Sequence, residues 1–137
     1  MSTTRVTPEF LWALGRVGPA IASRDGFRVV TTVTRYDMDD NKGTTRIYGI
    51  TSSPSTALAS NSVSSTEPAL SDSGSMMAFV RVVDDVRQIH VMATTGDEAR
   101  AVTDVPIGAT SPQWLPDESG LVFLSMVYRN ALTHEQA

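Results

Sequence analysis

The sequence predicts an all-β fold: a partial β-propeller of about two and a half four-stranded blades, preceded by a short N-terminal helix. The first observation behind this prediction is a repeat. A proline, a short apolar step, an acidic turn with a glycine and an apolar strand occur three times, with turn glycines at Gly26, Gly74 and Gly120. The second is the period, because spacings of 48 and 46 residues between these glycines are typical of propeller blades or similar arrays. The third is that one such unit cannot bury both of its faces alone, so neighbouring units must stack against it.

Residues 1–18 are predicted to form a helical lead-in. Thr7 can cap the helix, Pro8 suits its first turn, and Glu9 complements the positive end of the helix dipole. Apolar residues follow at helical spacing until Gly15 ends the pattern.

Residues 19–66 are predicted to form the first blade. Strands at 29–34 and 46–50 flank the polar connection 37–43, which indicates a hairpin with a solvated tip. The stretch 51–66 is rich in serine, threonine and alanine, and is interpreted as a loop around one weak strand at 57–60.

Residues 67–106 are predicted to form the second blade, and they carry the most regular copy of the repeat. Residues 76–83 are almost continuously apolar, as expected of a strand covered on both faces. The next strand, 88–93, alternates in polarity. Gly96 suits the positive φ of a tight turn, and residues 99–103 are expected to return as a short outer strand.

The alternation within 88–93 predicts which side chains share a face. Successive side chains of a strand point to opposite faces of the sheet, so Ile89 and Val91 are expected on one face, with His90 and Met92 on the other.

Residues 107–137 are predicted to hold the start of a third blade and an irregular tail. A strand is expected at 120–127, and no alternation follows Tyr128. We therefore interpret the chain as a truncated product that contains part of a larger propeller.

The composition is that of one soluble domain. A chain of 137 residues with 41% apolar content can bury about two-thirds of its unfolded surface. No apolar run is long enough to cross a membrane, and the first residues lack a secretion signal, so a cytoplasmic location is expected. A net charge of −4 argues against nucleic acid as a partner, and the absence of cysteine excludes disulfides and thiolate metal sites.

The sequence assigns no catalytic, cofactor-binding or metal-binding residues, and no cofactor is expected. Asp37, Asp39 and Asn41 have the first spacings of a calcium loop. However, Lys42 and Tyr48 stand where such a loop requires glycine and glutamate.

The other candidates for chemistry also favour structural roles. His90 and His134 are the only histidines, and nothing at metal-ligand or relay spacing accompanies them. No Gly-x-Ser-x-Gly nucleophile elbow occurs, and residues 73–75 are interpreted as a turn. Trp12 and Trp114 are expected to pack in the core or between units.

Two sets of residues resemble known propellers. PALSDSGSMMAFV at 68–80, with QIHV at 88–91 and GDEARAVT at 96–103, resembles a blade repeat in which Ser-Pro-Asp-Gly precedes an apolar strand. The opening is similar to the start of the propeller domain in the prolyl oligopeptidase family, particularly its acylaminoacyl-peptidase and dipeptidyl-peptidase-like members. It comprises TPEFL at 7–11, PAIA at 19–22, DG at 25–26, VTRYD at 33–37 and NK at 41–42. The resemblance covers about residues 7–127.

This resemblance implies a propeller that sits over a separate α/β-hydrolase domain and screens peptide substrates by size. The serine, aspartate and histidine of that domain map onto no residue of this sequence, so the chain itself is expected to be non-catalytic. Arg24 and Ser73 are interpreted as replacing the usual turn prolines, and residues 117–120 as carrying an insertion.

Three functions are therefore compatible with the sequence. The chain is expected to be a propeller fragment of a serine peptidase, with the remaining blades and the hydrolase domain as its partners. The alternatives are a binding module that resembles the propeller proteins of the Tol system, and a small independent β-domain. Because a fragment leaves a blade face uncovered, the isolated chain is expected to self-associate.

Overall fold

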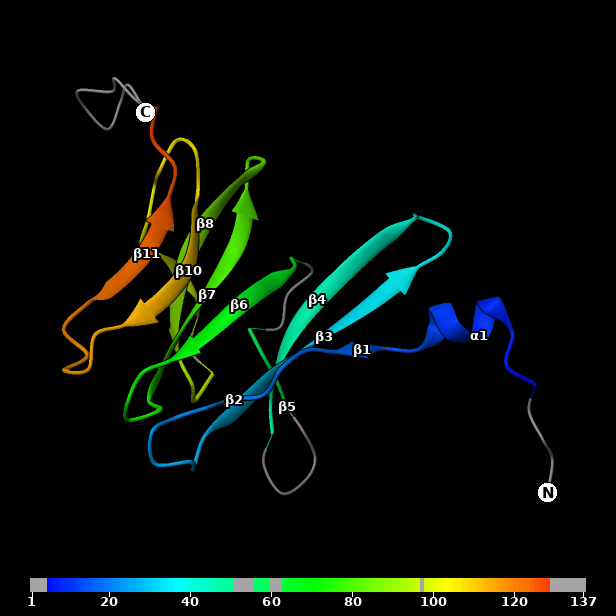
Figure 1. Cartoon of the computed structure of the whole chain (residues 1–137), viewed down its shortest axis with the longest axis horizontal. Coiled ribbons are helices and arrows are strands. Elements are labelled where there is room, and N and C mark those ends of the chain that lie inside the picture. Colours follow the sequence, from blue (N-terminus) through cyan, green and yellow to red (C-terminus); the bar gives the residue numbers. More distant parts are fainter. Residues whose placement is uncertain (1–4, 51–55, 60–62, 97, 129–137) are drawn as a thin grey trace.

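The computed structural model describes residues 5–50, 56–59, 63–96 and 98–128. Within them, one short helix precedes three antiparallel sheets that follow one another along the chain. Figure 1 shows the sheets side by side, with α1 at one end of the stack and β11 at the other.

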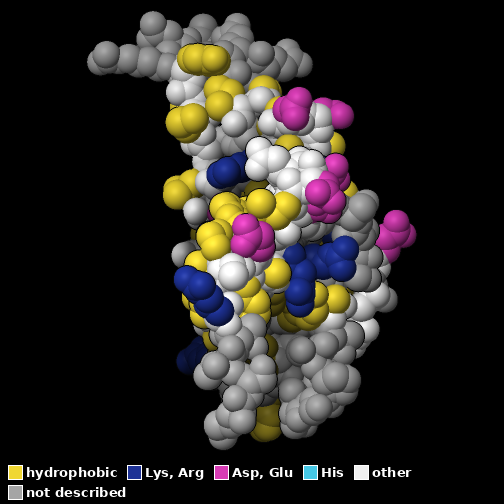
Figure 2. Space-filling view, turned by 90° about the vertical axis from the view of Figure 1, so that its right-hand side faces the viewer, with side chains coloured by type: hydrophobic (Ala, Val, Ile, Leu, Met, Phe, Trp, Pro, Cys, Tyr) yellow, Lys and Arg dark blue, Asp and Glu magenta, His cyan; other side chains and the backbone are white. Residues whose placement is uncertain are grey.

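The helix α1 spans Pro8–Ala13. Thr7 is its N-cap, and the Thr7 hydroxyl accepts the Phe10 backbone N–H at 3.3 Å. None of its side chains is buried. The side of the molecule that carries α1 faces the viewer in Figure 2, where hydrophobic and basic side chains lie next to each other across the middle of the face.

Sheet 1 contains five strands. They are β1 (Arg16–Val17), β2 (Ile21–Ala22), β3 (Val29–Asp37), β4 (Lys42–Gly49) and β5 (Thr56–Leu58). Both β1 and β2 pair with β3, and the order continues through β4 to β5. The expected connection 37–43 is shorter than predicted, because the ladder continues to the Asp37–Lys42 pair. The outer part of this hairpin includes the Tyr36–Gly43 pair. A hydrogen bond between the Thr34 and Thr45 hydroxyls also joins its two strands.

Sheet 2 contains four strands in sequence order. They are β6 (Ser65–Leu70), β7 (Met76–Val83), β8 (Val86–Ala93) and β9 (Arg100–Ala101). The predicted strand 76–83 is present with these bounds, whereas the outer strand is shorter than the predicted 99–103. The expected loop 51–66 is wrong at its end, because β6 begins at Ser65. Residues 51–55 and 60–62 lie outside the described residues.

Sheet 3 contains two strands in the described residues, β10 (Ala109–Trp114) and β11 (Leu121–Ser125). The strand β11 ends two residues before the predicted limit at 127. The tail after Tyr128 lies outside the described residues.

A β-bulge recurs beside the repeat proline. In β6 the register shifts between Thr66 and Ala69, around Pro68, and Glu67 has a φ of 51°. In β10 the register shifts in the same way around Pro112, and Ser111 has a φ of 53°. Proline cannot donate to a ladder, so a bulge is where it is tolerated within a strand. The short apolar step of the repeat lies in β2 of sheet 1 and in the first strands of the other two sheets, β6 and β10.

The tight turn that follows this strand has the same hydrogen bonds in every repeat. We name the turns one (residues 23–26), two (71–74) and three (115–118). The first N–H of each turn donates to the carbonyl five residues later, and the fourth N–H donates to the carbonyl of the first residue. The bonds are Ser23 N to Arg28 O (2.8 Å), Gly26 N to Ser23 O (2.9 Å), Ser71 N to Met76 O (2.9 Å), Gly74 N to Ser71 O (2.9 Å), Leu115 N to Gly120 O (3.0 Å) and Glu118 N to Leu115 O (2.9 Å).

This pattern corrects the alignment of the third repeat. Gly26 and Gly74 occupy the left-handed fourth position with φ of 75° and 71°, and there Glu118 has a φ of 58°. Gly120 is therefore the counterpart of Met76, and the residues at 117–120 are not an insertion. The position of the turn proline is also corrected: Pro116 occupies it in turn three, and its counterpart in turn two is Asp72, not Ser73.

Sheet 2 lies between the other two sheets, with one apolar cluster on each of its faces. The cluster toward sheet 1 contains Val30, Ile47, Met77, Phe79 and Met92. The cluster toward sheet 3 contains Ala78, Val80, Ile89, Val91, Val105 and Ala109, with Trp114 and Leu121 packed against it. The predicted alternation of β8 is confirmed, because Ile89 and Val91 face sheet 3 while Met92 faces sheet 1.

Candidate functional site

The strongest candidate site is the seam where sheet 3 packs on sheet 2. Three sets of polar contacts hold this seam, and an apolar groove opens along it. Each contact joins residues that are far apart in sequence, so together they fix how one sheet is oriented on the next.

The Gln88 side chain clamps the segment that connects the two sheets. Its Nε2 donates to the Val105 carbonyl at 2.9 Å, and its Oε1 accepts the Val105 N–H at 3.1 Å and the Thr103 hydroxyl at 2.7 Å. The Thr103 oxygen in turn accepts the Ile89 N–H at 2.8 Å. Gln88 is buried, so these bonds satisfy polar groups that water does not reach freely.

The two bulges are joined directly. The Glu67 carboxylate of β6 accepts the Ser111 backbone N–H of β10 at 2.7 Å. Nearby, the Trp114 indole N–H donates to the Ala69 carbonyl at 3.1 Å, while its ring packs on the cluster between the sheets. Trp114 is thus a packing residue between units.

The turns are linked in series along one edge of the stack, and the link between turns two and three lies at this seam. Arg24 of turn one donates to the Asp72 carboxylate of turn two at 3.1 Å. The Glu118 carboxylate of turn three accepts the backbone N–H of Ser73, and it accepts the Ser73 hydroxyl at 3.1 Å. The hydrogen bond from the Ser73 backbone N–H lowers the pKa of Glu118 below its usual value, and the hydrogen bond from the Ser73 hydroxyl lowers it further.

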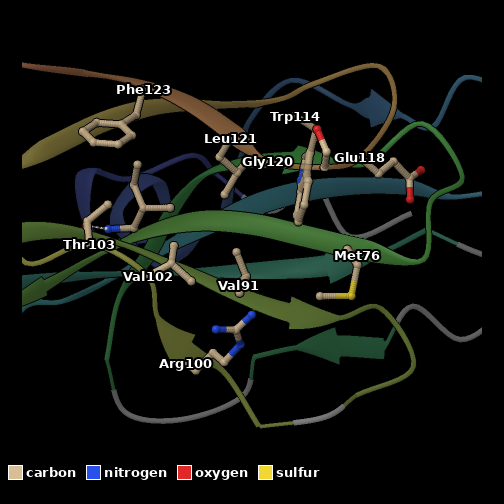
Figure 3. A pocket seen from close by; sticks show the side chains of 12 residues that line it. Met76, Val91, Arg100, Val102, Thr103, Trp114, Glu118, Gly120, Leu121 and Phe123 are labelled. Atoms are coloured by element: carbon tan, nitrogen blue, oxygen red, sulfur yellow. Dashed lines mark hydrogen bonds between the residues drawn. The ribbon is translucent and has the colours of Figure 1, made fainter.

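The groove lies beside this seam and has a volume of about 480 Å³. Val91 of β8 and Val102, which follows β9, line it on one side, and Leu121 and Phe123 of β11 line it on the other (Figure 3). Ile89 of β8 also belongs to the lining of the groove. Its ionisable rim consists of Arg100 and Glu118, and its surface is mainly apolar.

Within the described part of the chain, no element packs on the far face of sheet 3. The turn hydrogen bonds align Val122 with Ala78 and Leu124 with Val80. Ala78 and Val80 are 0% and 2% exposed because sheet 3 packs on them, whereas Val122 and Leu124 are 52% and 65% exposed. Sheet 3 therefore exposes apolar side chains at the positions that are buried between sheets 2 and 3 in the preceding repeat.

His90 is buried on the other face of sheet 2. Its ring stacks on Phe79 with centroids 6.0 Å apart, and Nδ1 lies 3.3 Å from the Gln88 carbonyl. The Arg81 guanidinium lies 4.9 Å from the centroid of the same Phe79 ring and donates to the Ser65 hydroxyl at 2.9 Å. Burial lowers the pKa of His90 and the charge of Arg81 lowers it too, whereas the hydrogen bond with the Gln88 carbonyl raises it, and the net shift is downward.

The structure brings none of the other sequence candidates together into a chemical site. The Asp37 carboxylate accepts the backbone N–H groups of Asp39 and Asp40, at 2.9 and 3.3 Å, within a tight hairpin turn. In the described part of the chain, no three carboxylate or histidine side chains gather closely enough to hold a metal ion. His134 lies outside the described residues.

The remaining aromatic and serine candidates occupy structural settings. Trp12 makes an edge-to-face contact with Tyr36 at 5.5 Å, and the Arg16 guanidinium lies over both rings. Ser73 and Gly74 belong to turn two and Ser75 follows it, and the Ser73 and Ser75 hydroxyls are 2.8 Å apart. Across the described ranges, no helix is long and apolar enough to span a membrane.

Sequence reasoning missed the polar residues that hold the seams, which are Glu67, Gln88 and Glu118. A weak signal exists for one of them. Glu67 and Ser111 directly precede the repeat prolines, so the repeat itself places them at equivalent positions.

Comparison with curated proteins gives relatives that are much longer. The chain is 30% identical over 125 residues to the uncharacterized peptidase YuxL of Bacillus subtilis, covering 88% of this chain and 19% of that protein. It is 28% identical over 123 residues to dipeptidyl-peptidase 5 of Porphyromonas endodontalis, covering 88% of this chain and 18% of that protein. The chain therefore spans about a fifth of the length of these relatives. No protein-family model matches the sequence.

Solved structures show the fold. The β-propeller domain of the trilobed protease from Pyrococcus furiosus superposes with a TM-score of 0.67 at 18% identity, covering 84% of this chain and 35% of that one. Pyrococcus horikoshii acylaminoacyl peptidase gives 0.69 at 18% identity, with coverage of 89% and 19%. TolB from Acinetobacter baumannii gives 0.57 at 12% identity, with coverage of 80% and 26%. The three sheets therefore have the arrangement found in β-propellers.

Proposed function

We propose, on the premise that this chain is homologous to the propeller portion of peptidases of the prolyl oligopeptidase family, that it is a non-catalytic propeller segment of such an enzyme. The observation that carries this proposal is the pair of seams. The described residues are built to stack sheet on sheet, and the face of sheet 3 at the end of the stack is made like the faces inside it.

In this proposal sheets 1 and 2 are complete blades and sheet 3 is the inner half of a third, about two and a half blades in all. The expected boundaries are a lead-in at 1–18 and blades at 19–66, 67–106 and 107–137. Because β1 pairs with β3 and β6 begins at Ser65, we move the first blade to start at Arg16 and the second to start at Ser65.

The proposed role is substrate gating. A completed propeller would sit over a hydrolase domain and admit peptides by size, so that the catalytic residues belong to the hydrolase domain. The relatives named as peptidases support this, as does a groove whose lining supplies apolar packing surface. A cytoplasmic location is part of the same proposal.

The first test extends the coding DNA beyond the codon for Ala137. We expect an extension that encodes further blade repeats and then a Gly-x-Ser-x-Gly elbow. An extension without either one would contradict the proposal.

The second test compares activities. The pure 137-residue chain should hydrolyse neither acyl-peptide nor dipeptidyl reporter substrates, whereas the extended protein should hydrolyse one of them. The control is the extended protein with its elbow serine replaced by alanine, which should be inactive. Turnover by the 137-residue chain itself would overturn the assignment.

The alternative is a docking platform like the Tol-system propellers, which the likeness to TolB favours at the level of fold. It predicts an exported protein. Detection of the chain in a periplasmic fraction, with no hydrolase encoded downstream, would support it over the peptidase segment.

A further inference from the structure

We infer that the isolated chain associates head to tail, with the outer face of sheet 3 in one copy packed on the outer face of sheet 1 in a second copy. The inference rests on the proposed function, because it treats the sheets as blades. It also names the partner and the two surfaces involved.

The two seams within the chain follow one rule. Between sheets 1 and 2, the side chains of Val30 and Ile47 meet those of Met77 and Phe79. Between sheets 2 and 3, the side chains of Ala78 and Val80 meet that of Leu121. Since the turn hydrogen bonds align Val30 with Ala78 and Met77 with Leu121, each seam joins the same face of one sheet to the opposite face of the next.

Among the described residues, one face of each kind has no sheet packed on it. These are the face of sheet 3 that points away from sheet 2 and the face of sheet 1 that points away from sheet 2. On sheet 3 the open face carries Val122 and Leu124, which are 52% and 65% exposed. Their counterparts in sheet 2 are almost completely buried by a neighbouring sheet. The open face of sheet 3 therefore has apolar side chains at the same positions as the face of sheet 2 that packs on sheet 3.

On sheet 1 the open face is the one that points away from sheet 2. Val17 pairs with Val33 on this face and is 70% exposed. Val29 aligns with Met77 through the turn hydrogen bonds, yet it is only half-buried whereas Met77 is 0% exposed. A second copy that presents its sheet 3 would cover this face as sheet 1 covers Met77.

Such a contact joins two different surfaces, so it differs from a symmetric dimer in which one surface meets itself. Two substitutions separate the possibilities. Leu124→Lys blocks the face on sheet 3, and Val17→Lys blocks the face on sheet 1. Val83→Lys is the matched control, because Val83 is 44% exposed but lies on sheet 2, whose two faces are covered.

Sedimentation velocity across the micromolar range measures the result. We expect the average mass of the wild-type chain and of the Val83→Lys chain to rise above 14.7 kDa with concentration. Each single-face variant should stay monomeric. An equimolar mixture of the two should form a 1:1 complex and nothing larger, because one intact copy of each face remains.

Several outcomes would overturn the inference. They are a wild-type chain that stays monomeric, a Val17→Lys chain that still self-associates, and a mixture that forms no complex. None of these outcomes bears on whether the coding DNA continues into a hydrolase domain, so the proposed function and this inference fail separately.

A second measurement covers the case in which a lysine disturbs folding. The sequence has no cysteine, so Leu124→Cys and Val17→Cys each introduce a single thiol. After mild oxidation of the mixed variants, disulfide-linked heterodimers should exceed those formed by Leu124→Cys mixed with Val83→Cys. An equal yield in the two mixtures, or a predominance of Leu124→Cys homodimers, would contradict the head-to-tail contact.

Discussion

The Glu67 carboxylate accepts the backbone N–H of Ser111 at 2.7 Å, and the two residues occupy the same bulge position in successive repeats. Both have a left-handed backbone, with φ of 51° and 53°. One repeat thus bonds to the bulge of the next, at a place where the ladder itself leaves an N–H unpaired.

Replacing Glu67 should weaken this bond. Glu67→Ala is expected to lower the free energy of unfolding by about 0.5–1.5 kcal/mol, the usual net value of a hydrogen bond. Glu67→Gln should retain most of the stability, because its amide oxygen can still accept. Urea denaturation at a concentration where the chain is monomeric measures the change, and Glu98→Ala is the exposed control. A loss for Glu67→Ala no greater than for the control would argue against the link.

Gln88 should matter more, because its partners are buried. Gln88→Ala leaves the Val105 N–H and carbonyl without these bonds, at an expected cost of about 1–3 kcal/mol. Hydrogen exchange at the Val105 amide should accelerate in parallel. Gln113→Ala, at an exposed glutamine of β10, is the matched control and should change the free energy of unfolding by less than about 0.5 kcal/mol.

Phe79 is fully buried between sheets 1 and 2. Phe79→Ala should lower the free energy of unfolding by about 3–5 kcal/mol, because it removes a large apolar side chain and leaves a cavity. Phe27→Ala is the control, since Phe27 is 85% exposed. A change below about 1 kcal/mol for Phe79→Ala would be inconsistent with its place in the core.

The lowered pKa of Glu118 predicts a contribution to acid sensitivity. Its two bonds from Ser73 favour the charged carboxylate, so their stabilisation is present above the unfolded-state pKa of about 4.5 and is lost as pH falls through the lower folded-state pKa. Glu118→Gln should therefore reduce the pH dependence of stability below about 4.5. An unchanged slope in thermal melts over this range would contradict the prediction.

The lowered pKa of His90 predicts a separate effect at higher pH. Burial disfavours the protonated ring of His90. The contribution of the neutral ring to the free energy of unfolding should therefore be fully present above its ordinary pKa of 6.5, and it should be lost as pH falls through the lower folded-state pKa. His90→Gln should remove the pH dependence just below 6.5 while leaving that near 4.5. If both variants altered the same pH range, the two assignments would be wrong.

Local patterns in the sequence were sufficient for several elements. Gly26, Gly74 and Gly96 have the expected positive φ, because turn geometry depends on a few adjacent residues. The alternation of β8 predicted its two faces, because side-chain direction in a strand has a period of two. The third repeat was misaligned, because Glu118 adopts a conformation that composition alone assigns to glycine.

The seams were not predictable in this way. Glu67 meets Ser111 across 44 residues, and Ser73 meets Glu118 across 45. No local period encodes which polar side chain will reach a neighbouring sheet. The sequence pattern around Gln88 did not predict its hydrogen bonds to Val105.

By itself the sequence determined a repeated strand–turn–strand unit and an acidic, cysteine-free composition, because propensity, turn chemistry and polarity act over short stretches. Only the tertiary structure decided how the units align, which polar groups join them and which faces stay open. Those features depend on the distance and burial that arise when one sheet is packed on another.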